Sequence, residues 1–166
     1  EEIVERTRQD LEKIMCQAGE KLCADVGVYN LPTEIVCLLG RFKYRYSYGQ
    51  NMIQHTLEET KIGVEIARLI GADINVVKLG CLLHDVGKIH IPAEILSSPN
   101  ILSPAQYALI KEHPDSGYEI VKGISFESTI KEIILQHHER LDGSGYPNGL
   151  KGDEISLPVR IVMVAD

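Results

Sequence analysis

Two adjacent histidines, His137 and His138, follow the apolar run 130–135 and stand directly before a loop with two glycines and a proline, residues 141–147. Such an apolar run favours a buried helix, so both imidazoles are expected at its end. The glycines allow close backbone approach, and Pro147 stiffens the turn. Ligand-type side chains beside a rigid loop indicate a functional site.

Other histidines and aspartates are expected at inward-facing or helix-end positions, although chance would scatter them over solvated faces. With the histidine pair they form a candidate metal-binding set: His55, His84, Asp85, His113, His137, His138 and Asp166. Imidazole and carboxylate donors suit iron, manganese or zinc, and differ from the cysteine-rich ligands of structural zinc. We expect iron or manganese.

Seven ligands exceed what one tetrahedral ion takes, so the sequence predicts two divalent ions roughly 3.5–4 Å apart. His84 and Asp85 point about 100° apart on a helix, and a bridging Asp85 carboxylate would reconcile that angle. Such a centre holds a hydroxide for attack on phosphorus, while Lys88 stabilises the developing charge. The expected reaction is phosphodiester hydrolysis, with Lys88 and Asp85 as catalytic residues.

Apolar side chains recur at intervals of three and four residues, which predicts the helices that must position the site. Helices are expected at 3–26, from Thr33 to about 39, at 50–70 and at 74–86, and a short turn of helix is expected to end at Leu96. Further helices are expected from Ser103 to about 121, from about 130 to His138, and from Pro158 to Asp166. Pro114 should bend the helix that starts at Ser103 directly after His113. No strand-like alternation is sustained, so we expect an all-α fold. The first helix either packs on the core or pairs with its own copy in a homodimer.

The composition limits the classes of partner. Apolar residues make up 44% of the 166 residues, but no run approaches the roughly 20 residues of a membrane span, so we expect no membrane contact from this segment. A net charge of -7 argues against general nucleic-acid binding, whereas a compact phosphate-containing ligand needs only a local basic patch. The four cysteines, Cys16, Cys23, Cys37 and Cys81, lack Cys-x-x-Cys spacing and are expected as free thiols in a reduced cytoplasm.

Residues 41–46, Arg-Phe-Lys-Tyr-Arg-Tyr, form the only basic and aromatic cluster. The cluster could stack on a nucleic-acid base. We favour the alternative, a solvated helix end whose rings cover the core.

Several motifs in register over about residues 55–166 resemble the HD-GYP family, a branch of the HD metal-dependent phosphohydrolases. They are His84-Asp-Val-Gly-Lys88, Ile91-Pro92, Glu112-His-Pro114, the eleven residues His137 to Pro147, and the segment Arg160 to Asp166. A His-Asp pair alone is weak evidence, but the eleven-residue motif with four others is specific. The resemblance implies an HD-domain helical bundle at 49–166, cut short at its C-terminus, behind an N-terminal helical extension at 1–48.

The resemblance also implies roles for single residues. The seven residues named above would bind the metals, Lys88 would lie at the scissile phosphate, and substrate contacts would come from Lys88, Arg140, Asp142, Gly143 and Tyr146. The implied activity is hydrolysis of the cyclic dinucleotide cyclic di-GMP to pGpG or GMP. In this family the loop 142–147 is also linked to contacts with diguanylate cyclase domains.

Departures from the pattern keep alternatives open. Asn51 stands four residues before His55, where family members with a third metal have glutamate, so we expect two ions. The loop 96–99 lacks a lysine of many relatives, which leaves the substrate open. Residues 40–56 are similar to the approach to the HD domain in ribonuclease Y. The alternatives are therefore an HD phosphohydrolase or nuclease acting on RNA or nucleotides, and a binding module without turnover.

Overall fold

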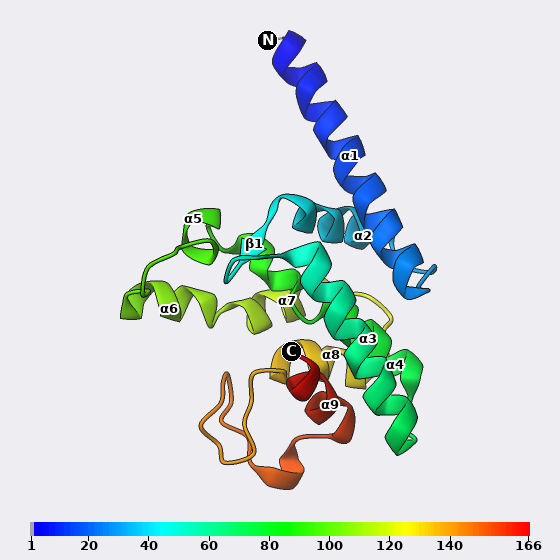
Figure 1. The fold of residues 1–166 in the computed structure, drawn as a ribbon, viewed down its shortest axis with the longest axis vertical. Helices are drawn as coiled ribbons and strands as arrows, with labels where there is room; N and C mark the ends of the chain where they lie inside the picture. The colour runs from blue at the N-terminus through cyan, green and yellow to red at the C-terminus, as the bar shows by residue number, and fades with distance from the viewer. Residues whose placement is uncertain (1) are drawn as a thin grey trace.

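The computed structural model describes residues 2–166, and helices make up most of that part of the chain (Figure 1). The α-helices are α1 (Glu2–Val26), α2 (Thr33–Gly40), α3 (Met52–Ile70), α4 (Ile74–Leu83), α5 (Ala93–Leu96), α6 (Pro104–Ile110), α7 (His113–Val121), α8 (Ser128–Gln136) and α9 (Leu157–Ala165). Short 3₁₀ helices lie at η1 (Arg41–Tyr44), η2 (Val86–His90) and η3 (Gly152–Glu154). The predicted all-α fold is confirmed.

One small hairpin interrupts the helices. The strands β1 (Tyr46–Ser47) and β2 (Gln50–Asn51) pair antiparallel, with Tyr46 opposite Asn51. At the turn Tyr48 has φ 49° and Gly49 φ 81°, so the backbone is left-handed at both residues. The hairpin pairs residues on both sides of position 48, and the predicted division into 1–48 and 49–166 stays a prediction.

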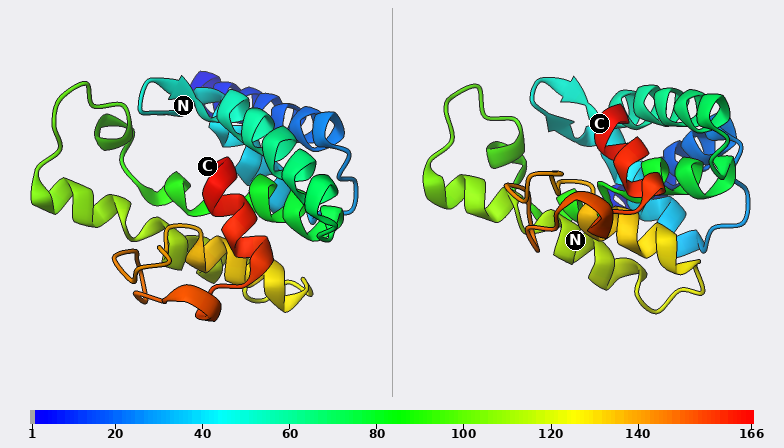
Figure 2. Two further views of the ribbon diagram at one scale, coloured as in Figure 1. Left: turned by 60° about the horizontal axis from the view of Figure 1, so that its bottom comes forward. Right: turned by 90° about the horizontal axis from the view of Figure 1, so that it is seen from below.

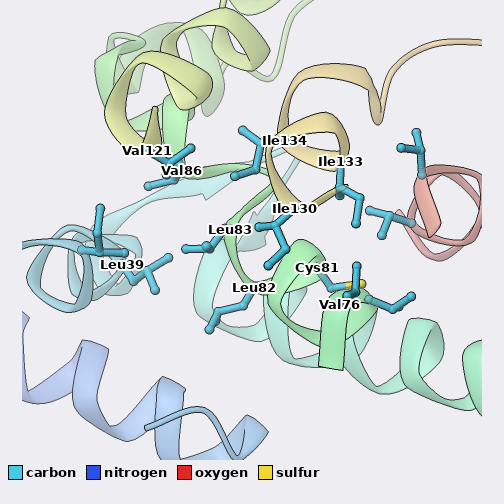
Figure 3. Close-up of a cluster of buried hydrophobic side chains, with 14 of the residues drawn as sticks. Leu39, Val76, Cys81, Leu82, Leu83, Val86, Val121, Ile130, Ile133 and Ile134 are labelled. Atoms are coloured by element: carbon cyan, nitrogen blue, oxygen red, sulfur yellow. The ribbon is translucent and has the colours of Figure 1, made fainter. Parts of the chain in front are cut away.

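The main core includes buried side chains from α1 to α4 and from α7 to α9, and Figure 3 shows part of it. Helices α4 and α8 pack against each other, and Leu82, Leu83, Ile133 and Ile134 on them are fully buried. Burying one such side chain stabilises the fold by about 1.5–3 kcal/mol. Because the helices that carry the histidines are those that build this core, the ends of these helices are held firmly.

Helix α1 extends away from the body of the molecule, with its N-terminal half exposed, and packs against α2 near its C-terminal end (Figure 1). Glycines permit this contact: a Cβ on Gly19 would lie 1.8 Å from the carbonyl oxygen of Val36, and one on Gly40 would lie 1.6 Å from that of Met15. Any side chain at either position would push the two helices apart.

The prediction of four free thiols is wrong for two of them. Cys16 of α1 and Cys37 of α2 form a disulfide, with 4.0 Å between their Cα atoms. The close approach at the glycines brings these two positions together, which cysteine spacing along the chain does not reveal. Cys23 and Cys81 are free and buried, as expected.

Two predicted helix boundaries are also wrong. Helix α4 ends at Leu83 rather than Val86, and a 3₁₀ helix follows. The helix expected from Ser103 to 121 breaks before His113 rather than after it, because Pro114 occupies the first turn of α7, where its missing N–H costs no hydrogen bond. Both changes place ligand-type residues at helix ends.

Among residues 2–166, no helix combines the length and apolar character needed to cross a lipid bilayer.

Candidate metal centre

All seven predicted ligands converge on one region where several elements end or begin. His55 lies on α3, His84 and Asp85 follow α4, His113 opens α7, His137 and His138 follow α8, and Asp166 follows α9. Their ligand atoms form two adjoining groups, and the atoms of each group lie within 4.8 Å of one another. The predicted convergence is therefore present in the structure.

The first group contains His55, His84, Asp166 and a fourth residue, Glu59. The Nε2 atom of His55 lies 3.3 Å from Oδ1 of Asp166 and 3.5 Å from Oε2 of Glu59. The Nε2 atom of His84 lies 3.2 Å from the same Glu59 oxygen. This group combines two imidazole nitrogens with two carboxylates.

The second group contains Asp85, His113, His137 and His138. The Nε2 atoms of His113 and His137 face each other at 3.0 Å, and Oδ1 of Asp85 lies 3.4 Å from Nε2 of His113. Asp85 Oδ1 also lies 3.4 Å from Nε2 of His84 in the first group. The Asp85 carboxylate therefore stands between the two groups, where the sequence predicted a bridge.

Backbone carbonyls fix the tautomers of three buried histidines. Nδ1 of His84 lies 2.8 Å from the Cys81 oxygen, Nδ1 of His113 lies 2.7 Å from the Ile110 oxygen, and Nδ1 of His137 lies 2.9 Å from the Ile134 oxygen. A carbonyl only accepts hydrogen bonds, so each Nδ1 carries the proton and donates it. In each ring Nε2 is then the nitrogen that faces the site, and its lone pair can bind a metal ion when Nε2 carries no proton.

Burial holds the second group's imidazoles neutral. It lowers the pKa of His113 to about 3 and that of His138 to about 4, and it takes the pKa of His137 well below its usual value. Burial alone would raise the pKa of Asp85, but the positive charges of His84 and Lys88 hold it well below the usual value. The second group therefore presents neutral nitrogens and an ionised carboxylate, which are the forms that bind metal.

The first group is electrostatically different. Burial opposes a charge on His84, but the carboxylates of Asp85 and Glu59 raise its pKa to about 10. Burial raises the pKa of Glu59 to about 8. Without a metal ion, His84 and Glu59 therefore hold protons near neutral pH, and a metal ion bound by both residues would displace these protons.

Several buried polar atoms of the centre have no hydrogen-bond partner within the described chain. They are both carboxylate oxygens of Glu59, Nε2 of His84 and Oδ1 of Asp85. Native proteins rarely leave such atoms unpaired unless an ion or water completes them. The unpaired atoms and the nitrogen and oxygen donors fit two divalent metal ions, one at each group.

Lys88 lies at the edge of the centre. Its Nζ donates to Oδ2 of Asp85 at 2.7 Å, and the side chain is buried. Arg45 holds the backbone beside it by donating to the carbonyls of Ile89 and Ile91 at 2.7 and 2.5 Å. Within the basic and aromatic cluster, Arg45 and the buried Phe42 thus serve the fold, as we favoured. The prediction that its rings cover the core holds for Phe42 but not for Tyr44 and Tyr46, which are 52% and 51% exposed.

The loop after α8 is tied to the protein by Glu139, which is buried. Its carboxylate accepts hydrogen bonds from the backbone N–H groups of Asn148 at 2.6 Å and Leu150 at 2.9 Å. Within the loop, Tyr146 stacks on His138 with 4.9 Å between ring centroids. The loop is therefore joined to the metal centre through a ring of one of its ligands.

A cavity of about 930 Å³ opens over the two groups. Figure 2 shows the loop after α8, in orange, on the same side of the molecule as α5 and α6. The hairpin, α6 and this loop supply walls that include Tyr48, Tyr107, Lys111, Arg140 and Tyr146, and the floor includes His55, Lys88, His137, His138 and Asp166. Its volume lies at the upper end of the roughly 300–1,000 Å³ of small-molecule sites.

The HD domain family matches residues 71–166, which is more than half of the chain. The chain belongs to the HD domain family. The predicted likeness to HD proteins is thereby confirmed.

Three relatives of the HD domain differ in what their names say they act on. The chain is 38% identical over 121 residues to the 3'3'-cGAMP-specific phosphodiesterase 1 of Vibrio cholerae, covering 71% of this chain and 28% of that protein. It is 36% identical over 138 residues to ribonuclease Y of Chloroflexus aurantiacus, and the match covers 83% of this chain and 24% of that protein. It is 44% identical over 96 residues to the cyclic di-GMP phosphodiesterase response regulator RpfG of Xanthomonas campestris, and the match covers 57% of this chain and 25% of that protein. The chain thus spans about a quarter of the length of these relatives.

A solved structure shares the fold. Bd1817, described as an HDG"Y"P protein from Bdellovibrio bacteriovorus, matches 93% of this chain and 56% of its own with a TM-score of 0.65 and 23% identity. This likeness concerns the HD fold and includes most of the N-terminal helices.

The predicted substrate residues have mixed surroundings in this HD domain. Arg140 and Asp142 are exposed and line the cavity, although Asp142 Oδ1 also accepts from the Ser144 N–H at 2.9 Å within the loop. Gly143 has φ 82°, and a Cβ there would lie 2.4 Å from the side chain of Lys151. Its need for glycine therefore comes from the turn, and its predicted contact with substrate stays a prediction.

Sequence reasoning missed Glu59 and Glu139. Glu59 follows His55 by four residues, so the two share one face of α3, and this spacing was the available signal. Glu139 stands inside the motif that was quoted, but nothing in its spacing shows that it accepts hydrogen bonds from residues 148 and 150.

Proposed function

We propose that this HD domain is a metal-dependent phosphodiesterase that hydrolyses cyclic di-GMP to pGpG or GMP. The observation that carries the proposal is the cavity itself, in which two metal-binding groups that share Asp85 form the floor and the loop 142–147 forms a wall. The names of the relatives support phosphodiester cleavage, and RpfG supports cyclic di-GMP.

Residues of the two groups would hold divalent ions, for which we propose iron or manganese. Bound there, the ions would supply an activated water for attack on phosphorus and neutralise phosphate oxygens. The protein's own part is to hold the neutral imidazoles by their Nδ1–H groups and to keep Lys88 beside Asp85 at the cavity floor. From there the Lys88 ammonium group would stabilise charge on the reacting phosphate.

The upper walls suit the rest of a dinucleotide. Lys111 lies between two rings, with Nζ 4.9 Å from the centroid of Tyr107 and 5.1 Å from that of Tyr146. Aromatic faces stack on nucleobases, and a cation near them attracts phosphate. These residues, with Arg140, would bind the part of the substrate that is not cleaved.

The test is product analysis with protein purified without oxygen and reconstituted with Fe²⁺ or Mn²⁺. Cyclic di-GMP should yield pGpG or GMP on chromatography, and the double variant His84→Ala, Asp85→Ala should yield neither product. If 3'3'-cGAMP is cleaved and cyclic di-GMP yields no linear product, the substrate is 3'3'-cGAMP instead. Metal analysis of the same samples would test iron against manganese.

A nuclease or nucleotide phosphohydrolase is the second candidate, favoured by the match to ribonuclease Y across 83% of the chain, including its N-terminal part. A panel of 5′-monophosphorylated RNA and nucleotides separates the two functions. If RNA is cleaved and the cyclic dinucleotides are not, the second candidate function is established and the first is overturned. Ligand binding by the double variant without metal would instead favour a binding module.

We further propose a cytoplasmic location, contact of the loop 142–147 with a diguanylate cyclase domain, and homodimerisation through α1. The exposed apolar side chains Ile3, Val4 and Leu11 on α1 support the dimer. Sedimentation of the wild type and of the variant Ile3→Asp, Val4→Asp, Leu11→Asp would test it, since loss of the apolar surface should leave a monomer.

A further inference from the structure

Glu59 is a buried acidic side chain without a protein partner. The residue is 1% exposed, and neither carboxylate oxygen forms a hydrogen bond within the described chain. A buried carboxyl group that forms no hydrogen bond is costly in a protein, whether or not it is ionised. Its presence one helical turn after His55 therefore requires an explanation.

A ring nitrogen of His84 lies close to the Glu59 carboxylate. Oε2 of Glu59 lies 3.2 Å from Nε2 of His84, whose Nδ1–H already donates to the Cys81 carbonyl. Neither of these two atoms has a hydrogen-bond partner within the described chain. A metal ion beside both would bind the lone pair of Nε2 and the Glu59 carboxylate together.

We propose that Glu59 is a metal ligand that completes the first group with His55, His84 and Asp166. The ligand atoms of these four residues lie within 4.8 Å of one another. The inference rests on the metal centre of the proposed function but not on its substrate.

Asn51 cannot take this role, because its side chain is committed elsewhere. Its oxygen accepts from the Ile53 N–H at 3.0 Å, which caps α3, and its nitrogen donates to the Lys43 carbonyl at 3.0 Å. The carboxylate that this chain brings to the first group lies on the other side of His55 in sequence, at position 59.

With Glu59 as a ligand, the two metal sites are unequal. The first offers two nitrogens and two carboxylates, and the second offers three nitrogens and the Asp85 carboxylate. Carboxylate oxygen favours harder ions such as Mn²⁺, whereas imidazole suits softer ones such as Zn²⁺. The first site should therefore discriminate less strongly against Mn²⁺ relative to Zn²⁺ than the second site does.

The decisive variant is Glu59→Gln, which keeps the shape but removes the charge. The glutamine amide can also hydrogen-bond to Nε2 of His84 whether that nitrogen carries a proton or a lone pair, so glutamine would satisfy the pocket if Glu59 served structure alone. Its matched control is Glu58→Gln on the same helix, where an exposed carboxylate accepts from Gln50 and Gln54 at 2.8 and 2.5 Å.

The measurement is metal per chain by mass spectrometry after dialysis against Mn²⁺, with circular dichroism to verify folding. We expect two ions in the wild type and in Glu58→Gln, and one in Glu59→Gln. Affinity for the lost ion should fall more than ~100-fold, because removal of residues outside the first ligand shell already costs 10–100-fold. Two tightly bound ions in Glu59→Gln would overturn the inference.

Anomalous scattering from Mn²⁺ in wild-type crystals tests the same inference if the variant does not fold. An ion within bonding distance of Glu59 would support it, and an ion bound by His55, His84 and Asp166 alone would overturn it. Product analysis is independent of both measurements. Loss of one ion in Glu59→Gln together with a wild type inert toward cyclic di-GMP would leave this inference standing and remove the proposed substrate.

Discussion

The floor and the walls of the cavity are built in different ways. The floor consists mostly of buried residues at helix ends, with His84, Asp85 and His137 at most 2% exposed. The upper walls come from a hairpin turn, α6 and the loop after α8, where Tyr48 is 75% and Tyr107 43% exposed. The floor is thus fixed by the core, while the walls can vary without disturbing it.

Under the proposed function, the reaction of this HD domain would depend on donors that the core holds in place. The fit of the substrate would depend on the exposed side chains of the walls. Substitutions in the floor should therefore affect metal content and kcat, and substitutions in the walls should affect KM. Each variant below tests that division.

The largest effect is expected from Asp85→Ala, because Asp85 lies between both donor groups and also holds Lys88. Loss of the shared carboxylate should remove at least one ion per chain and lower kcat by roughly 10³-fold or more. Metal analysis and steady-state kinetics measure the two effects together. A variant with full metal content and reduced kcat would show that Asp85 serves the reaction without holding the metals.

The next largest effect is expected from Lys88→Met, which retains the length of the side chain but not its charge. If Lys88 stabilises charge in the transition state, kcat should fall by about 10²–10³-fold while metal content stays at two ions. The variant also leaves Oδ2 of Asp85 without its 2.7 Å partner, so thermal unfolding must be measured alongside. A change in KM alone would show that Lys88 binds the substrate rather than stabilising charge in the transition state.

The sequence predicted the floor better than the walls, for a physical reason. Helical periodicity gives the buried face of each helix, and this was sufficient to place His55, His84 and His137 at the centre. It does not give where a helix ends at a turn such as Leu83. The four-residue spacing from His55 favours Glu59 over Glu58 for the same helix face, but it does not show how deeply Glu59 is buried, which depends on packing against α4 and α9.

Contacts between residues on different helices or loops also could not be predicted from local sequence patterns. The disulfide between Cys16 and Cys37 depends on the crossing of α1 and α2, which Gly19 and Gly40 allow. The loop after α8 was predicted to contact the substrate, but its attachment through Glu139 depends on backbone groups nine and eleven residues away. Local patterns contain no information on either pairing.

Glu139→Gln tests whether the wall must be anchored. The amide retains one acceptor oxygen but turns an N–H₂ group toward a backbone donor, which costs about 1–3 kcal/mol for the unpaired group. The loop 142–147 should loosen, and KM should rise by about 10-fold with metal content unchanged. Kinetics and amide hydrogen exchange of the loop measure this, and Glu119→Gln on the exposed side of α7 is the control. Loss of metal would show that the anchor supports His138 rather than the wall.

The smallest effect is expected from Tyr107→Ala, on the part of the wall farthest from the core. Stacking on a nucleobase contributes about 1–3 kcal/mol per base, and an exposed ring should lie at the low end of that range. KM for a cyclic dinucleotide should therefore rise about 5-fold while kcat and metal content stay unchanged. Tyr29→Ala, equally aromatic but 77% exposed and outside the cavity, should change nothing. A decrease in kcat with unchanged KM would contradict the division between floor and walls, because a residue this exposed would then be needed by the reaction itself.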